Sequence, residues 1–249
     1  MLGMAKMLGI AKTETVEMIC LANSRKMQGR CIAGLRTDGQ GWIRPVAAGA
    51  DGTLHAADYC LPDGSEPQIL DVIQLGCAGG KPEPHQPENQ RVSRTPWQLV
   101  SRPAPGCLPE AVRSLLLGSL VKGPLLLGNF GDKRDYGILC RTPAASSLVL
   151  VAPENLLWHI KTGVRGNRQT KAEFHLTHTP YSLSVTDPVW AQRLAHLPNG
   201  RYPREAASVG ADEQILFTVS LSEPLEWNNH CYKLVAGVIT LPNCSKDSP

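Results

Sequence analysis

Residues 16–46 carry three strand signals separated by two turn signals, and this spacing restricts how the chain can fold. The first strand signal alternates apolar residues and is expected to stop at Asn23-Ser24, because these side chains hydrogen-bond to their own backbone. A second strand is expected over residues 30–36, and Asp38-Gly39 predicts the turn into a third strand over residues 42–46. The segment therefore predicts a three-stranded antiparallel meander.

The turn between the first two of these strands is basic. Residues 1–46 contain seven Lys or Arg and three acids. Arg25, Lys26 and Arg30 lie in or beside the turn, where flexible cations and backbone N–H groups can meet an anion together. A solvated surface loop would have the same composition, so charge alone leaves both interpretations open.

The rest of the chain favours short strands over long helices. Its 249 residues include Gly 23 and Pro 20, which implies many turns while staying below the content typical of disorder. Further strands are expected over residues 69–75, 147–151, 156–160, 172–176, 181–185, 214–221 and 232–241, and helices over residues 108–120 and 189–197. The predicted class is mainly β, with two or three short helices.

Composition also excludes several classes of protein. No apolar run approaches the ~18 residues of a membrane span, and the N-terminal residues lack a secretory signal pattern. We therefore expect a cytoplasmic protein that has no membrane partner and no disulfides. The eight cysteines occur singly, without a C-x-x-C or a Cys/His cluster, so no metal site and no cofactor are predicted. The net charge of +3 is small, so any nucleic-acid surface must be a local patch.

A second cationic segment lies in the other half of the chain. Residues 155–172 contain four cations and no acid; the cations are Lys161, Arg165, Arg168 and Lys171. We expect residues 161–171 to form a loop between two strands that can wrap an anionic backbone. The residues that could stack on bases beside it are Trp158, His159, Phe174 and His175. A mobile surface loop without a ligand is the alternative.

Two further segments suggest other activities. Residues 85–89, HQPEN, form a compact polar cluster in which His85 could act as a general acid and Glu88 as a general base, or which could seal a strand edge. Residues 205–226 contain five acids and no Lys or Arg. That stretch should repel polyanions and could instead bind a protein partner.

The order of several short motifs resembles that of the bacterial dual OB domain family. The motifs are ANSRK at residues 22–26, GRC-x-AG at 29–34, WIRPV at 42–46, HQPEN at 85–89, VTDP at 185–188, SEP at 222–224 and CYKLVAG at 231–237. The resemblance implies two tandem OB-like Greek-key barrels: an N-terminal domain with an insertion over residues 14–130 and a C-terminal domain over residues 140–243. It also implies a nucleic-acid-binding role in bacterial conflict systems.

The leading hypothesis is therefore a non-catalytic module that binds or senses nucleic acid, single-stranded or modified, in bacterial defence. The candidate contact residues are Asn23, Arg25, Lys26, Arg30, Trp42 and Arg44 in the first half, and Lys161, Arg165, Arg168 and Lys171 in the second. Because the chain has only 5 Trp, 5 Tyr and 3 Phe, a short strand or a single nucleotide suits it better than a long stacking platform. The alternatives are a nucleotide-acting hydrolase or lyase that uses Glu88 and His85, and a protein-interaction subunit.

Overall fold

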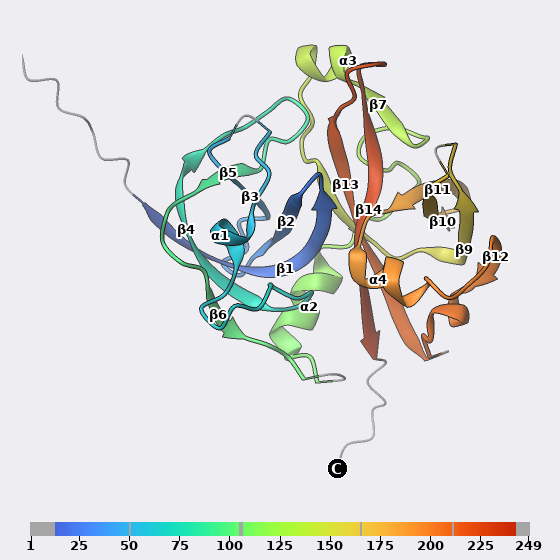
Figure 1. Ribbon diagram of the computed structural model, residues 1–249, viewed down its shortest axis with the longest axis horizontal. Coiled ribbons are helices and arrows are strands. Elements are labelled where there is room, and N and C mark those ends of the chain that lie inside the picture. Colours follow the sequence, from blue (N-terminus) through green and yellow to red (C-terminus); the bar gives the residue numbers. More distant parts are fainter. Residues whose placement is uncertain (1–12, 50, 105–106, 165, 211, 243–249) are drawn as a thin grey trace, which may run out of the picture.

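Two β-barrels lie side by side in the structure, a computed structural model that describes residues 13–49, 51–104, 107–164, 166–210 and 212–242 (Figure 1). The first barrel is built from the N-terminal strands and the second from the C-terminal strands. In the view of Figure 1, β13 and β14 of the second barrel lie on the side that faces the first barrel. The predicted class, mainly β with tandem OB-like barrels, is confirmed.

The first barrel closes through one long strand. Its strands are β1 (Glu14–Lys26), β2 (Gly29–Arg36), β3 (Trp42–Val46), β4 (Val72–Gly80) and β5 (Asn89–Val92), in the order β1-β2-β3-β5-β4. The first part of β1 pairs with β4 and the later part with β2, so the sheet returns to its starting strand. The strand β6 (Gln98–Ser101) extends the sheet beyond β4, and the helix α1 (Ala56–Tyr59) lies between β3 and β4 in the sequence.

The second barrel has the same order with an interrupted first strand. Its strands are β8 (Leu148–Val151), β9 (Glu154–Thr162), β10 (Arg168–Leu176), β11 (Thr179–Val185), β13 (Glu213–Pro224) and β14 (His230–Pro242). β8 pairs with β13 and β9 pairs with β10, so the two together take the place that β1 has in the first barrel. Pro153, which has no N–H donor, lies at the break between them. Two short strands, β7 (Lys133–Asp135) and β12 (Gly200–Pro203), add to β14 and β9.

The described residues form four short α-helices, α1, α2 (Glu110–Gly118), α3 (Tyr136–Arg141) and α4 (Pro188–Arg193), and one 3-10 turn, η1 (Arg204–Ala207). The sequence predicted α2 and α4. The helix α4 begins where VTDP places a cap, since the Asp187 carboxylate accepts hydrogen bonds from the Val189 and Trp190 backbone N–H groups. None of the helices in the described part of the chain is long and apolar enough to cross a membrane. The domain limits 14–130 and 140–243 stay predictions.

Two predicted strand boundaries are wrong. In both cases the strands extend further than predicted, so cations that we expected in loops lie on strands. The strand β1 does not stop at Asn23-Ser24, because both residues pair with β2 and the Asn23 amide Nδ2 donates to the Pro67 carbonyl at 2.8 Å. Sheet pairing therefore outweighs the local turn preference of these two residues. In the second half, β9 and β10 extend into the expected loop, so only residues 163–167 connect them. Lys161, Arg168 and Lys171 consequently lie on strands.

The outer surface of the first barrel is buried against the second. Successive residues of a strand point to opposite faces, so β1 places Met18 and Cys20 in its own core and directs Ile19 and Leu21 outward. These outward residues pack with apolar residues of β2, β13, β14 and α2, and together they form an inter-barrel core: Leu35, Leu216, Ile239, Leu241 and Leu116. The first strand of the chain is therefore buried on both faces.

The two barrels approach each other closely at Gly237 of β14. A Cβ atom on Gly237 would lie 2.1 Å from the Leu21 carbonyl oxygen of β1, a distance that backbone atoms cannot accommodate without moving apart. Glycine at this position lets the two strands cross in contact.

We expect Gly237→Ala to lower the free energy of unfolding by about 1–3 kcal/mol, because the added methyl group overpacks the junction. Urea denaturation followed by tryptophan fluorescence measures the change. Gly118→Ala on α2 is the control, since a Cβ atom there would meet nothing within 4 Å and alanine favours a helix. A Gly237→Ala protein as stable as wild type would contradict the close contact.

Candidate functional site

A buried guanidinium links the two barrels. Arg44 of β3 is 2% exposed. Its Nη2 donates to the Ser147 Oγ at 2.7 Å and to the Ser220 Oγ at 3.0 Å, both in the second half of the chain. Its Nη1 donates to the Cys31 Sγ at 3.0 Å, and its Nε and Nη2 lie 3.3 and 3.2 Å from the Glu88 Oε1. Burial alone would lower the pKa of Arg44, but Cys31 and Glu88 outweigh burial and raise it.

Glu88 also takes part in the contact between the two barrels. Its side chain is 7% exposed. Besides Arg44 it accepts a hydrogen bond from the Ser147 backbone N–H at 3.2 Å and another from the Ser147 hydroxyl. Because both carboxylate oxygens have donors within the protein, the arrangement is that of an anchor between the barrels.

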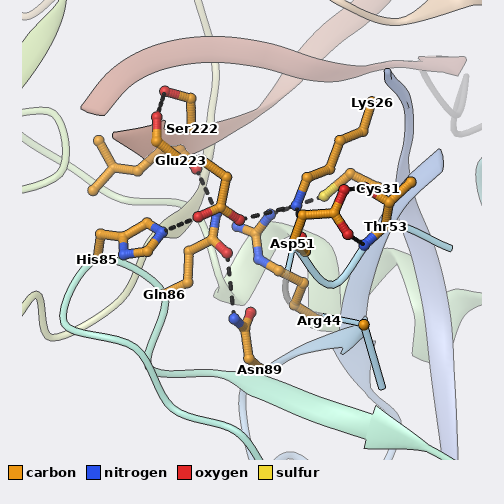
Figure 2. A network of polar contacts seen from close by, with 12 residues as sticks. Lys26, Cys31, Arg44, Asp51, Thr53, His85, Gln86, Asn89, Ser222 and Glu223 are labelled. Atoms are coloured by element: carbon orange, nitrogen blue, oxygen red, sulfur yellow. Dashed lines mark hydrogen bonds and ion pairs between the residues drawn. The ribbon is translucent and has the colours of Figure 1, made fainter. Parts of the chain in front are cut away.

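A second set of polar contacts converges on Glu223 at the end of β13 (Figure 2). The Lys26 Nζ lies 2.9 Å from one carboxylate oxygen and the His85 Nε2 lies 2.7 Å from the other. Lys26 also donates to the Asp51 carbonyl oxygen. Burial alone would raise the pKa of Glu223, but the hydrogen bonds from His85 and Lys26 outweigh burial and lower the pKa to about 2.

The predicted acid/base cluster is thus divided between two partners. His85 contacts Glu223, whereas Glu88 contacts Arg44 and Ser147. His85 is 2% exposed and its ring lies edge-on to Tyr136, with 5.4 Å between the ring centroids. Among the residues that the structure describes, no three His, Cys, Asp or Glu side chains are grouped so that they could hold a metal ion.

Most of the other candidates in the first half also have partners inside the protein. The Arg30 Nη2 lies 2.7 Å from the Glu66 carboxylate, and Asn23 donates to the Pro67 carbonyl. Trp42 is half-buried and packs against the inter-barrel core. Arg25 differs, because it is exposed and makes no ion pair within the described part of the chain. Its backbone N–H donates to the Thr186 carbonyl at 3.3 Å, which places it beside the second barrel.

The second barrel has an open face that carries two lysines. Alternate residues of β10 point into the core, as Ala172 and Phe174 do, so Lys171 points outward. The pairing registers place Lys171 beside His159 of β9, and Lys161 of β9 beside Gln169 of β10. No residue described in the structure forms an ion pair with Lys161 or Lys171.

The same face also carries an acid whose negative charge is balanced by neighbouring side chains. The Glu173 carboxylate contacts the Arg201 Nε at 2.7 Å and the His159 Nδ1 at 2.8 Å. The Arg201 hydrogen bond is the main reason that the pKa of Glu173 is lowered. Because Glu173 is balanced by Arg201, the two lysines give this face an excess of positive charge.

The remaining candidates of the second cationic segment do not join this face. Arg168 lies on the opposite side of β10 from Lys171, and its Nη2 donates to the Leu194 carbonyl at 2.9 Å and to that of Leu197, just beyond α4. Arg165 lies outside the described residues. Trp158 is 0% exposed and Phe174 is 2% exposed, so the core holds both rings and neither can stack on a base.

The acids of residues 205–226 do not form one face. Glu205, Asp212 and Glu213 lie at or before the start of β13, whereas Glu223 and Glu226 lie at or beyond its end. A strand of 12 residues spans about 40 Å, which separates the two groups. Glu223, moreover, belongs to the junction. A protein partner at this stretch stays a prediction.

Sequence reasoning missed how His159 and Arg201 share a face with the lysines. The available signal was the two-residue period of a strand, which puts His159 and Lys161 on the same side of β9. The pairing of Arg201 with His159 had no comparable local signal, because β12 joins the sheet from a distant part of the chain.

Comparisons with known proteins give a family and only weak structural similarity. The family model described as "Dual OB-containing domain" matches residues 16–238. A solved structure of a murine DNA-binding protein bound to double-stranded DNA matches with 7% identity and a TM-score of 0.28, over 92% of this chain and 97% of that one. A similarity at that score says nothing about the ligand of this chain. No curated protein matches the sequence.

We expect Arg44→Met to lower the free energy of unfolding by about 3–5 kcal/mol, because it leaves the buried Glu88 carboxylate without its cation. Urea denaturation measures this. Arg201→Met is the matched control: the Arg201 side chain is 60% exposed, so the loss of its pair with Glu173 should leave the free energy of unfolding nearly unchanged. Equal losses in the two variants would show that Arg44 does not hold the junction.

The pKa of Glu223 predicts an acid-sensitive contribution to stability. Since the pKa is about 2 in the folded state against an ordinary 4.5, the unfolded state takes up a proton first as the pH falls. Wild type should therefore exceed Glu223→Gln in stability by a constant amount above pH 4.5, and this excess should shrink as the pH falls towards 2. Urea denaturation at a series of pH values measures the difference.

The control for this series is Glu226→Gln, because Glu226 is exposed and has no ion-pair partner in the described residues. Its difference from wild type should stay small across the same range. A Glu223→Gln difference that does not change with pH would show that the carboxylate is not held by Lys26 and His85.

Proposed function

The chain belongs to the family of dual OB-containing domains, and from this premise we propose that it binds single-stranded nucleic acid on the outer face of its second barrel. OB barrels bind oligonucleotides across their second and third strands and the neighbouring loops. The observation that carries the proposal is that this face is open in the second barrel and covered in the first. A modified nucleotide as the ligand and a role in bacterial defence are further predictions from the family resemblance.

The difference between the barrels follows from the outward residues of the equivalent strands. In the first barrel β2 and β3 direct Leu35, Trp42 and Arg44 into the junction with the second barrel. In the second barrel β10 and its neighbour β9 direct Lys171 and Lys161 away from the core. A ligand that uses the family's usual face therefore has access to the second barrel.

The open face continues to the basic turn of the first barrel. On β11, Ser184 lies beside Lys171, and Thr186 follows Val185, the last residue of the strand. The Thr186 carbonyl accepts the hydrogen bond from the Arg25 backbone N–H. A surface hollow of about 380 Å³ adjoins this part of β10 and β11; its lining residues are Arg168, Gln169, Thr170, Ser184, Val185 and Ala191. One strand could therefore contact Lys161, Lys171 and Arg25 in succession.

The chemistry of this face favours contacts with the backbone of the nucleic acid. Apart from Leu157 and the Glu173–Arg201 pair, its outward side chains are lysines, hydroxyls and amides, with His159 and His175 as its flat rings. Lysines bind phosphates regardless of the base, so affinity should depend strongly on salt and weakly on sequence. The hydrolase or lyase alternative gains no support from the separate partners of His85 and Glu88.

We expect Lys161→Gln with Lys171→Gln to weaken binding of a fluorescein-labelled 12-residue oligothymidylate. Removing one phosphate contact to a single strand lowers the slope of log K against log salt by about 0.7, so the slope should fall by about 1.4. Fluorescence anisotropy at several salt concentrations measures it. Adding Arg25→Gln should lower the slope further if the strand reaches the first barrel.

The matched control is Lys122→Gln with Lys133→Gln, which removes the same charge from exposed positions outside this face. Its slope should stay near that of wild type. If both double variants lower the slope equally, binding depends on overall charge and the open face is not the site.

A further inference from the structure

A cavity of about 190 Å³ lies where the two barrels meet. Its walls are mainly apolar and come from both barrels; the apolar lining residues are Met27, Leu221, Leu225, Leu234 and Ala236. Arg44, Gln86, Lys26 and Glu223 also line it, but they already bond within the protein: the Gln86 Nε2 donates to the Leu221 carbonyl at 3.1 Å, and the Lys26 Nζ pairs with Glu223 at 2.9 Å. The cavity is therefore suited to a flat apolar group rather than to a charged one.

The size of the cavity limits what can enter. An apolar cavity of about 150 Å³ holds a benzene ring, so this one accommodates a single aromatic ring system and not a whole nucleotide. Met27 is 86% exposed and Leu225 is 38% exposed, and both line the cavity, so they form an open rim. Met27 comes from the β1–β2 turn of the first barrel and Leu225 from the β13–β14 connection of the second.

The rim lies on the path proposed for the bound strand. Thr186, which follows the last residue of β11, and Arg25, whose backbone bonds to it, both line the cavity. Arg25 places a cation without an ion-pair partner in the described residues beside an apolar opening. A phosphate held by Arg25 would bring the attached base close to this opening.

We propose that the cavity between the barrels binds one unstacked base of a single strand while Arg25 holds a neighbouring phosphate. This inference rests on the proposed function, because the strand must first lie on the open face. Apolar walls recognise the faces of a base and leave its polar edges towards the rim and solvent. The site therefore adds affinity for one base without strong discrimination among bases.

The test compares two labelled 12-residue strands, one with an abasic backbone throughout and one with a single thymine at its centre. Wild type should bind the strand with the thymine about tenfold more tightly, within the range expected for one bound base. Ser24→Leu, which fills the cavity from the β1 side, should bind both strands equally and bind the abasic strand as wild type does. Ser114→Leu, on the exposed surface of α2, should behave as wild type does.

If Ser24→Leu does not fold, Leu225→Trp blocks the same cavity from its rim and should give the same loss. Two results would overturn the base site alone: a thymine that adds no affinity in wild type, or a thymine that adds as much affinity in a folded cavity-filling variant as it does in wild type. Salt-dependent binding of the abasic strand that falls with Lys161→Gln and Lys171→Gln would then still support the proposed function. The absence of binding to either strand would overturn both.

Discussion

The contact on which the rest of the structure depends is the one between Arg44 and the two serines of the other barrel. A buried guanidinium is costly to desolvate and is tolerated only where its donors meet acceptors in one geometry. Ser147, Ser220, Glu88 and Cys31 supply these acceptors, so the two barrels have one relative position in which this charge is satisfied. The apolar inter-barrel core provides the favourable free energy of burial, and the polar contacts select the orientation.

This fixed orientation gives two similar barrels different surfaces. The first barrel uses the outer face of its second and third strands to bind the second barrel, and the second keeps the equivalent face free. The cations follow the same division: Lys26, Arg30 and Arg44 pair with carboxylates of the protein, whereas Lys161 and Lys171 have no such partner in the described residues. A cation already paired inside the protein has little left to offer a phosphate, so position in the fold decides which basic residues remain available.

The fold could be predicted from the sequence because its signals are local. Strand periodicity, Asp38-Gly39 and the ordered motifs of the family all act over short distances, and the barrels follow from them. The role of Arg44 could not be predicted, since the serines that bind it lie 103 and 176 residues away and WIRPV is the same sequence whether β3 meets a ligand or another barrel. The prediction that the first strand stops at Asn23-Ser24 was wrong for a related reason. The turn preference of these residues is local, whereas the pairing with β2 that overrides it is not. Alternation along β9 and β10, in contrast, was visible in the sequence and would have separated Lys171 from Arg168.

The proposed binding surface is composite, and its parts differ in what they require. Lys161 and Lys171 lie on adjacent strands of one barrel, so the pairing of β9 with β10 alone sets their spacing. Arg25 belongs to the other barrel, and its place beside Thr186 depends on every contact that holds the junction. The cavity depends on the junction even more than Arg25 does, because residues of both barrels line it. Arg44, which links the barrels, is one of these lining residues. Loosening the junction should therefore remove the contributions of Arg25 and of the base site while leaving those of the two lysines, so that weak, salt-dependent binding persists where the preference for a base is lost.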